Sequence, residues 1–395
     1  MGFHSTGKDT PTQVSGGIAN PFLCFYKMVY ICRVKLILRI KLLPTIDQSK
    51  SLIRTIIQAN AACCSISEIA WNKRIFNQFK LHHETYNGIK AGYDLSAQMI
   101  VRCISKVTDA YKADRKTKRQ FRPMGAISFD SRILSYTKDS VSIKTVDGRL
   151  KGIPFICHNG KYFPYIKGES DLVFRKGKFF LLQTVEIAEE GVKEVDDFIG
   201  CDFGQTDICT LSDGTNYHSE ALKKVRKKYA RVRAGVQSKG TKGSKKLLKR
   251  LSGRERRFVS INNHAISKQV VAKAKAENKG VTIEDLSNIR KTAKPKSKTQ
   301  KTELNRWSFY QLRQYLEYKA RLSGVRLFAV PPAYTSQMCC ECLYIGKREG
   351  KRFSCEHCGN RMDADHNAAR NIAAWGRVIN SPEKPSILCC SVHCA

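Results

Sequence analysis

The stretch "TSQMCCECLYIGKREGKRFSCEHCGNRMDADHNAARN" (335–371) decides how this sequence is interpreted, because it joins two kinds of motif. Two Cys-x-x-Cys pairs stand twelve residues apart, and an acidic pair, Asp363 and Asp365, follows the second one. Each Cys-x-x-Cys can turn both sulfurs toward one point, and two such knuckles supply four thiolates around Zn²⁺. Because four sulfurs fill a tetrahedral site, we predict a structural zinc ribbon. Its ligands are Cys339, Cys342, Cys355 and Cys358.

The residues around the two pairs refine this prediction. Gly359 follows the second pair and suits the tight turn of a knuckle, whereas Leu343 takes that place after the first. Cys340 stands between two ligands and should point away from the metal. Two disulfides are the alternative, but they need an oxidising compartment. Most other cysteines are scattered singly in apolar surroundings, as reduced core thiols would be: Cys32, Cys103, Cys157 and Cys209.

Three carboxylates stand where an acid is costly unless it has a purpose. Asp202 ends the apolar run "FIGCD", Glu284 ends "VTIE", and Asp365 opens the helical pattern "DHNAARNIAAW". Taken singly, they could be a turn residue, a strand terminus and a helix N-cap. Their order along the chain is that of ribonuclease-H-like nucleases, in which converging carboxylates hold two Mg²⁺ ions. We therefore predict Asp202, Glu284 and Asp365 to be catalytic magnesium ligands.

The tripeptide "DFG" (202–204) is also a protein-kinase signature. A kinase needs a glycine-rich phosphate loop and an H-R-D catalytic loop as well. The sequence contains neither motif, so the kinase interpretation is rejected.

The charge balance indicates a polyanionic partner. Seventy Lys and Arg residues against 34 Asp and Glu give a formal charge of +36. The segment 223–257 carries only Glu255 against a dense row of basic residues. Such a run can be a solvated helix face, but with so few acids to pair with it we predict phosphate contacts. The predicted nucleic-acid-binding residues are Lys223, Lys224, Arg226, Lys227, Lys228, Arg231, Lys245, Lys246 and Arg250.

Membrane is the other candidate polyanion. The most apolar early stretch, 21–43, is interrupted by five basic residues, so it is not predicted to be a transmembrane helix. No charged segment followed by a clean apolar run opens the chain, so no signal peptide is predicted. We expect a cytoplasmic protein without a membrane partner, associated with the nucleoid of a prokaryote.

Hydrophobic periodicity divides the chain into parts. Residues 34–42 alternate with period two and predict a strand. Residues 46–120 follow the helical period, with Asp47 as a possible cap of the first helix. Strand patterns return with a hairpin at 141–155, turning at Asp147-Gly148. From about residue 196, short strands alternate with helices, which indicates an α/β layer.

Five segments of the sequence resemble the TnpB family of RNA-guided DNA nucleases. "GCDFGQTDICTLSDG", "VTIEDLSNIR" and the 335–372 stretch resemble its three RuvC motifs and zinc ribbon. "RWSFYQLRQYLEYKARLSGV" (306–325) and "LHHETYNGIKAGYDLSAQMIVRCISKVTDAYK" (81–112) are also similar to family sequence. The resemblance covers most of residues 30 to 375, and its C-terminal motifs are the more specific ones.

The resemblance implies an α+β multidomain protein: a β-barrel (wedge, OB-like) with an inserted helical recognition bundle, followed by an RNase H-like (RuvC) α/β domain carrying the zinc ribbon. Asp202, Glu284 and Asp365 would be the three RuvC acids, and the ribbon would brace the cleft. The expected parts are a disordered leader at 1–27 before Met28, the wedge at 28–45 and 121–195, the helical bundle at 46–120, RuvC at 196–334 and 361–378, the ribbon at 335–360 and a tail at 379–395.

The resemblance also implies an insertion-sequence-associated, magnesium-dependent DNA endonuclease that uses guide RNA to find double-stranded DNA. A guide-independent RNase H-fold nuclease or transposase is one alternative, and a non-catalytic zinc-ribbon regulator is another. The tail is expected to be disordered, although a second metal site is the alternative there. That site would use Cys389, Cys390, His393 and Cys394.

Overall fold

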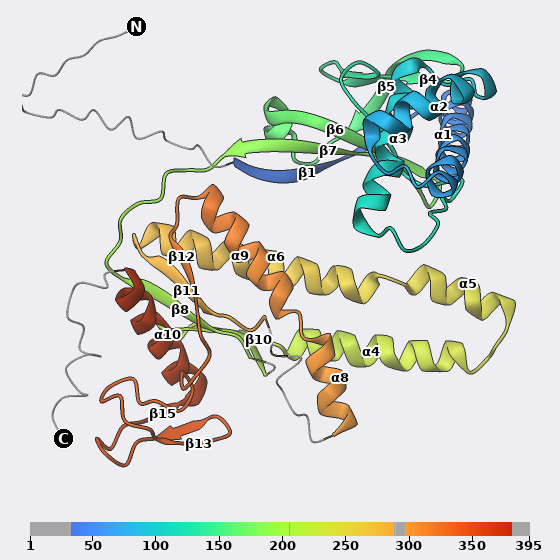
Figure 1. Ribbon diagram of the computed structural model, residues 1–395. Helices are drawn as coiled ribbons and strands as arrows, with labels where there is room; N and C mark the ends of the chain where they lie inside the picture. The colour runs from blue at the N-terminus through green and yellow to red at the C-terminus, as the bar shows by residue number, and fades with distance from the viewer. Residues whose placement is uncertain (1–32, 205, 288, 290–296, 381–395) are drawn as a thin grey trace, which may run out of the picture. The chain divides into compact units, whose positions relative to one another are not determined.

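The computed structural model (Figure 1) describes residues 33–204, 206–287, 289 and 297–380. The expected leader and the tail with its possible second metal site lie outside the described residues.

A seven-stranded antiparallel sheet forms a nearly closed β-barrel, with the strand order β2-β6-β7-β1-β5-β4-β3. The predicted first strand is confirmed as β1, in which Leu38, Ile40 and Leu42 are buried at period two. The predicted Asp147-Gly148 turn is also confirmed, between β4 and β5. The strands are β1 (Arg33–Leu42), β2 (Ile127–Phe129), β3 (Leu134–Tyr136), β4 (Ser140–Thr145), β5 (Gly148–Ile156), β6 (Ile166–Arg175) and β7 (Lys178–Ala188).

Three helices interrupt this sheet between β1 and β2: α1 (Ile46–Asn72), α2 (Gln78–Gly92) and α3 (Ala97–Ala113). The prediction that Asp47 caps the first helix is wrong. Thr45 is the cap: the backbone N–H of Gln48 donates to Thr45 Oγ1 over 3.3 Å. The Thr45 N–H donates in return to Gln48 Oε1 over 3.0 Å, which completes a capping box. Asp47 lies in the first turn, where its charge favours the helix dipole.

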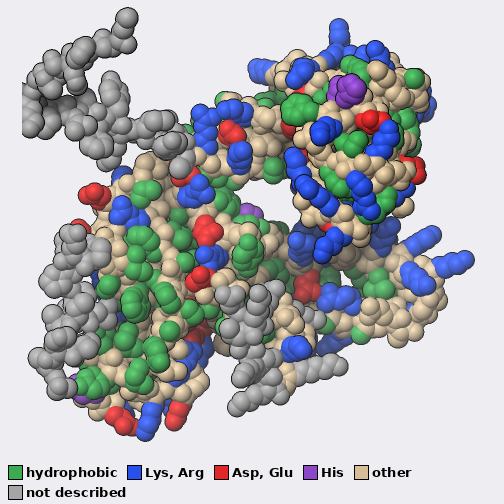
Figure 2. Space-filling view, viewed as in Figure 1, with side chains coloured by type: hydrophobic (Ala, Val, Ile, Leu, Met, Phe, Trp, Pro, Cys, Tyr) green, Lys and Arg blue, Asp and Glu red, His purple; other side chains and the backbone are tan. Residues whose placement is uncertain are grey.

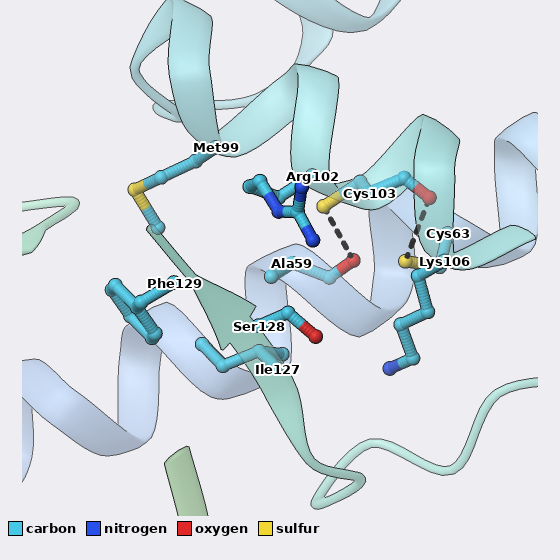
Figure 3. Close-up of a pocket in the computed structure, with 9 residues that line it drawn as sticks. All are labelled: Ala59, Cys63, Met99, Arg102, Cys103, Lys106, Ile127, Ser128 and Phe129. Carbon is cyan, nitrogen blue, oxygen red and sulfur yellow. Dashed lines mark hydrogen bonds between the residues drawn. The ribbon is translucent and has the colours of Figure 1, made fainter. Parts of the chain in front are cut away.

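The helical insert contains a buried pair of thiols, Cys63 and Cys103 (Figure 3). Cys63 Sγ lies 3.8 Å from the Cys103 carbonyl oxygen, and Cys103 Sγ lies 3.5 Å from that of Ala59. Every cysteine within the described part of the chain is a free thiol. The expectation of reduced core thiols is therefore confirmed for Cys103 and Cys209, while Cys157 is a free thiol that is partly buried against the core. Cys32 lies outside the described residues.

A five-stranded mixed sheet, with the order β10-β9-β8-β11-β12, organises the C-terminal part. β8, β11 and β12 run parallel, and β9 and β10 are antiparallel to their neighbours. Helices accompany the sheet, as predicted for an α/β layer (Figure 1). The elements are β8 (Phe198–Asp202), β9 (Asp207–Leu211), β10 (Asn216–His218), α4 (Glu220–Gln237), α5 (Lys242–Leu251), α6 (Arg254–Ala276), β11 (Gly280–Glu284), α8 (Lys298–Arg306), α9 (Phe309–Leu322), β12 (Leu327–Val330) and α10 (Ala364–Asn380).

The two faces of this sheet are packed differently. Ile199 and Cys201 of β8 belong to the core built with α6 and α9. Side chains alternate along a strand, so Gly200 and Asp202 belong to the opposite face. That face is covered by α10, and the helix approaches so closely that a Cβ at Gly200 would stand 2.0 Å from the Ala369 carbonyl oxygen.

The atoms that a Cβ at Gly200 would meet belong to the backbone of α10 and cannot rotate away. Gly200→Ala should therefore destabilise the C-terminal part by about 3 kcal/mol or more. The measurement is the midpoint of urea unfolding. Gly191→Ala is the matched control, since a Cβ there meets nothing within 4 Å. Equal midpoints for the two variants would contradict the close contact between β8 and α10.

Candidate nuclease site and zinc ribbon

Two of the predicted acids end neighbouring parallel strands. Asp202 is the last residue of β8 and Glu284 is the last residue of β11. The strand register pairs Cys201 with Ile283, directly before the two acids. The carboxyl ends of parallel strands meet at one edge of a sheet, and the side-chain alternation turns both acids toward the face that α10 covers.

The third acid, Asp365, lies in the first turn of α10 and is only 8% exposed. Asp363 Oδ1 accepts the backbone N–H groups of Asp365 and His366, over 2.9 and 3.1 Å. Asp363 is therefore the residue that caps this helix, and the alternative that Asp365 is merely an N-cap is wrong. The Asp365 carboxylate is left for other contacts.

The other two acids influence Asp202 electrostatically. Burial is the largest cause, and together with the negative charges of Glu284 and Asp365 it raises the pKa of Asp202 to about 8. Burial also raises the pKa of Glu284, against a hydrogen bond that its Oε1 accepts from Thr335 Oγ1 over 2.5 Å. The structure thus brings all three predicted acids to one edge of the sheet.

The carboxylates are nevertheless spaced more widely than the sulfurs of the ribbon. Among the described residues, only the four cysteines offer three or more ligand atoms that all lie within 4.8 Å of one another. Two cations contact Asp365: Arg348 Nη2 donates to Asp365 Oδ1 over 2.6 Å, and Lys351 Nζ lies 3.8 Å from Asp365 Oδ2. Lys351 also pairs with the buried Asp207.

Neither Arg348 nor Lys351 was predicted as part of the site, although the sequence contains one signal for them. They flank Gly350 (φ +61°), in the turn between β13 (Lys347–Glu349) and β14 (Arg352–Ser354) of the ribbon. The signal was the basic spacer between the cysteine pairs. Its local pattern did not indicate, however, that it would fold back so that Arg348 contacts Asp365, seventeen positions further on. A third strand, β15 (Arg361–Asp363), leads from the ribbon into α10.

Two buried amides of α10 attach the start of the ribbon to the helix. Asn371 Nδ2 donates to the backbone carbonyls of Thr335 and Met338, over 2.8 and 2.7 Å. Asn367 Nδ2 donates to the same Met338 carbonyl, and its Oδ1 accepts the N–H of Cys340. Hydrogen bonds between buried groups fix relative positions precisely. The ribbon and the helix that carries the third acid are therefore one rigid support.

The two cysteine knuckles of the ribbon have the same backbone geometry. The N–H of Leu343 donates to the Cys339 carbonyl over 3.0 Å, and the N–H of Gly359 donates to that of Cys355 over the same distance. Both donors have left-handed backbones, with φ of +66° for Leu343 and +74° for Gly359. The turn suits Gly359, as predicted, whereas Leu343 adopts it against its side-chain preference.

The four sulfurs fit a tetrahedral zinc ion. Cys339 Sγ lies 3.7 Å from Cys358 Sγ, and Cys342 Sγ lies 3.4 Å from Cys355 Sγ. Sulfurs about 2.3 Å from a tetrahedral zinc stand ~3.8 Å apart, whereas a disulfide brings them to about 2.05 Å. The disulfide alternative is wrong. Cys340 is not part of the cluster and contacts Met362, as expected for a residue that points away.

The predicted phosphate-binding residues lie on two consecutive helices, and Figure 2 shows Lys and Arg side chains projecting from this hairpin. All are exposed except Arg226, which is partly buried. Their role stays a prediction. Six lie on α4 (Lys223, Lys224, Arg226, Lys227, Lys228 and Arg231) and three on α5 (Lys245, Lys246 and Arg250). In the described part of the chain, no helix is both long and apolar enough to cross a membrane.

The chain is similar to known proteins over this region. The family described as "Cas12f1-like, TNB domain" matches residues 309–372. The TnpB-like protein MJ0751 of Methanocaldococcus jannaschii is 33% identical over 168 residues, which cover 42% of this chain and 60% of that protein. The putative RNA-guided DNA endonuclease InsQ of Escherichia coli K12 is 31% identical over 225 residues, which cover 51% and 55%.

The chain is also similar to Cas12f proteins, in sequence and in fold. The CRISPR-associated endodeoxyribonuclease Cas12f1 of Sulfoacidibacillus thermotolerans is 40% identical over 120 residues, 29% of this chain and 27% of that protein. The matches thus span less than two thirds of each of these three curated relatives. The cryo-EM structure of a Cas12f1–sgRNA–target DNA complex has the same fold, with a TM-score of 0.55 at 16% identity over 82% of this chain and 83% of that one. The sequence matches include TnpB-like and Cas12f proteins alike, and these similarities support a relationship of this chain to the TnpB family.

Proposed function

We propose that this protein is an RNA-guided, magnesium-dependent DNA endonuclease whose five-stranded sheet and α10 form a RuvC-type, ribonuclease-H-like domain. The observation that carries the proposal is the meeting of three acids from distant parts of the chain, of which Glu284 and Asp365 are buried and Asp202 is partly buried. Asp202 and Glu284 end adjacent parallel strands, and Asp365 begins the helix packed on the same face. Such a concentration of like charge is costly without bound cations.

The donor set fits Mg²⁺, because hard divalent cations prefer carboxylate oxygens. Asp202, Glu284 and Asp365 would hold two ions, which supply a bound water of lowered pKa and neutralise the leaving 3′ oxygen. The chain's own residues prepare this site. Thr335 orients Glu284 through its hydroxyl, and Arg348 holds one oxygen of Asp365. Arg348 also lowers the pKa of Asp202 and Glu284, which favours their ionised forms.

The partners proposed are a guide RNA and a double-stranded DNA target. The formal charge of +36 and the exposed basic hairpin of α4 and α5 support a large polyanionic ligand. InsQ and Cas12f1, to which this chain is similar, are named as DNA endonucleases, which supports the same assignment. Under this proposal, base pairing between the guide RNA and the target strand recognises the sequence, while the protein contacts the backbone of the heteroduplex. The resemblance to the TnpB family is also the ground for proposing an insertion-sequence association and a place at the prokaryotic nucleoid.

The decisive experiment is to purify the protein from cells that carry its own locus and to sequence any RNA bound to it. That RNA should direct Mg²⁺-dependent cleavage of DNA that matches its guide segment, and no cleavage should occur without Mg²⁺. Cutting that ignores the guide sequence would favour a guide-independent nuclease or transposase instead. A protein that binds RNA or DNA but never cuts would favour a regulator.

A further inference from the structure

A groove runs along α4 on the side that faces the junction of α8 and α9. It has two hollows, of about 480 and 360 Å³, and both are lined by Arg226, Trp307 and Ser308. The first hollow begins at Gly204 and Thr206, in the loop that directly follows Asp202. Its volume is within the range of ligand sites, roughly 300–1,000 Å³. The groove therefore starts within two residues of a proposed catalytic acid.

One stripe of α4 lines the groove. Lys223, Arg226, Lys227 and Ala230 line the first hollow, and Arg233 lines the second. Positions three and four apart lie on one helical face. At 1.5 Å per residue, the stripe from 223 to 233 is about 15 Å long. It is long enough to accompany an extended chain rather than a single small molecule.

The groove is strongly cationic. Five of its lining residues are basic, and Glu255 is its one acid among the described residues. Glu255 is itself held by Arg233 over 2.8 Å and lies 4.0 Å from Arg226. The remaining positive charge favours a ligand that carries a regular row of negative charges, as a nucleic-acid backbone does.

Trp307 adds an aromatic surface to this charge. It is half-buried, it borders both hollows, and its ring lies 5.1 Å from that of Phe309, centroid to centroid. Basic grooves with aromatic platforms bind single strands, because an unpaired base exposes a flat face on which an aromatic ring can stack. A paired base inside a duplex does not offer that face.

We propose that this groove holds a single strand of DNA that continues to or from the acids, with one base stacked on Trp307 and phosphates contacted by Lys223 and Lys227. The assignment deepens the proposed function and depends on it, because the position beside Asp202 is what identifies the strand as the DNA to be cut. It divides the predicted phosphate-binding lysines of α4 between two faces: Lys223 and Lys227 line the groove, whereas Lys224 and Lys228 do not and are not assigned to this strand.

The test uses the full chain with its guide RNA, Ca²⁺ in place of Mg²⁺, and a labelled oligodeoxythymidine. Trp307→Ala should weaken binding about 5- to 100-fold, and Trp307→Phe should restore much of it. The double variant Lys223→Ala/Lys227→Ala should reduce the slope of log affinity against log salt by about 1.4, which corresponds to two phosphates of a single strand. Lys224→Ala/Lys228→Ala, with the same charge loss on the same helix, should leave the slope unchanged.

A direct signal for stacking is available because the chain has three tryptophans. In a Trp71→Phe/Trp375→Phe background, the fluorescence of Trp307 should be quenched when the oligodeoxythymidine binds. A Trp307 with a purely structural role would show no such change, and that result would overturn the proposal.

Two further outcomes would overturn the groove assignment without touching the proposed function. One is a wild-type protein that cuts guide-matched DNA while both lysine pairs lower the salt slope equally. The other is a loss of affinity for the guide RNA, rather than for the DNA strand, in the Trp307 and Lys223/Lys227 variants. Failure of the wild-type protein to cut any guide-matched DNA would instead count against the proposed function itself.

Discussion

Glu284→Gln is expected to lower the rate of guide-directed DNA cleavage by at least about a thousand-fold, with little change in the stability of the fold. The amide keeps the shape of the side chain and can still accept the hydrogen bond from Thr335. It removes the negative charge that the proposed metal site needs. Stability should not fall, because burial already opposes ionisation of Glu284 and raises its pKa. The measurement is single-turnover cleavage at saturating guide and target.

The next residue provides the matched control. Asp285→Asn makes the same chemical change one position further along, on a partly exposed side chain that pairs with Arg313 over 2.5 Å. Exposed ion pairs contribute little, so cleavage should stay within about two-fold of the wild type. If Glu284→Gln cut DNA as fast as Asp285→Asn, the assignment of Glu284 to the catalytic centre would be wrong.

The positions of the acids were predictable because each depends on a local pattern. Asp202 and Glu284 follow short apolar strands, and strand ends of this kind meet at one sheet edge. The zinc ligands were predictable for a similar reason, since a Cys-x-x-Cys spacing specifies its own turn. The departure at the first knuckle was also apparent from the sequence. Leu343 occupies the position that Gly359 occupies in the second knuckle, and it adopts the same left-handed backbone.

Other features of the site depend on contacts between distant residues, and no local pattern contains them. Arg348 and Lys351 reach Asp365 only because the ribbon hairpin folds back over the start of α10. Thr335 reaches Glu284 across 51 positions of sequence. Trp307 looked like part of a family motif, and its place in a cationic groove became visible only once α4 and α9 were placed. The cap of α1 was missed for a smaller reason, because Asp47 and Thr45 are both good capping residues and only the geometry selects Thr45.

The zinc ribbon contributes directly to the site, because its β13–β14 hairpin carries Arg348 and Lys351, the cations that contact Asp365. Asn367 and Asn371 attach the ribbon to α10, so an unfolded ribbon would release both the helix start and the cations. Zinc binding supplies most of the folding free energy of small zinc modules, with apparent values of about 10–16 kcal/mol in zinc-finger peptides. The ribbon has only a small apolar core of its own, in which Phe353 is the largest side chain.

Cys355→Ser should therefore reduce bound zinc from about one ion per chain to nearly none, and cleavage should fall by more than about a hundred-fold. Zinc is measured by elemental analysis of the purified protein, and cleavage by the same single-turnover assay. Cys340→Ser is the matched control within the same motif: its sulfur contacts Met362 and stands outside the four-sulfur cluster, so zinc content and cleavage should both persist. Undiminished zinc in Cys355→Ser would contradict the four-cysteine site. Loss of zinc with full cleavage would show instead that Arg348 and Lys351 reach Asp365 without a folded ribbon.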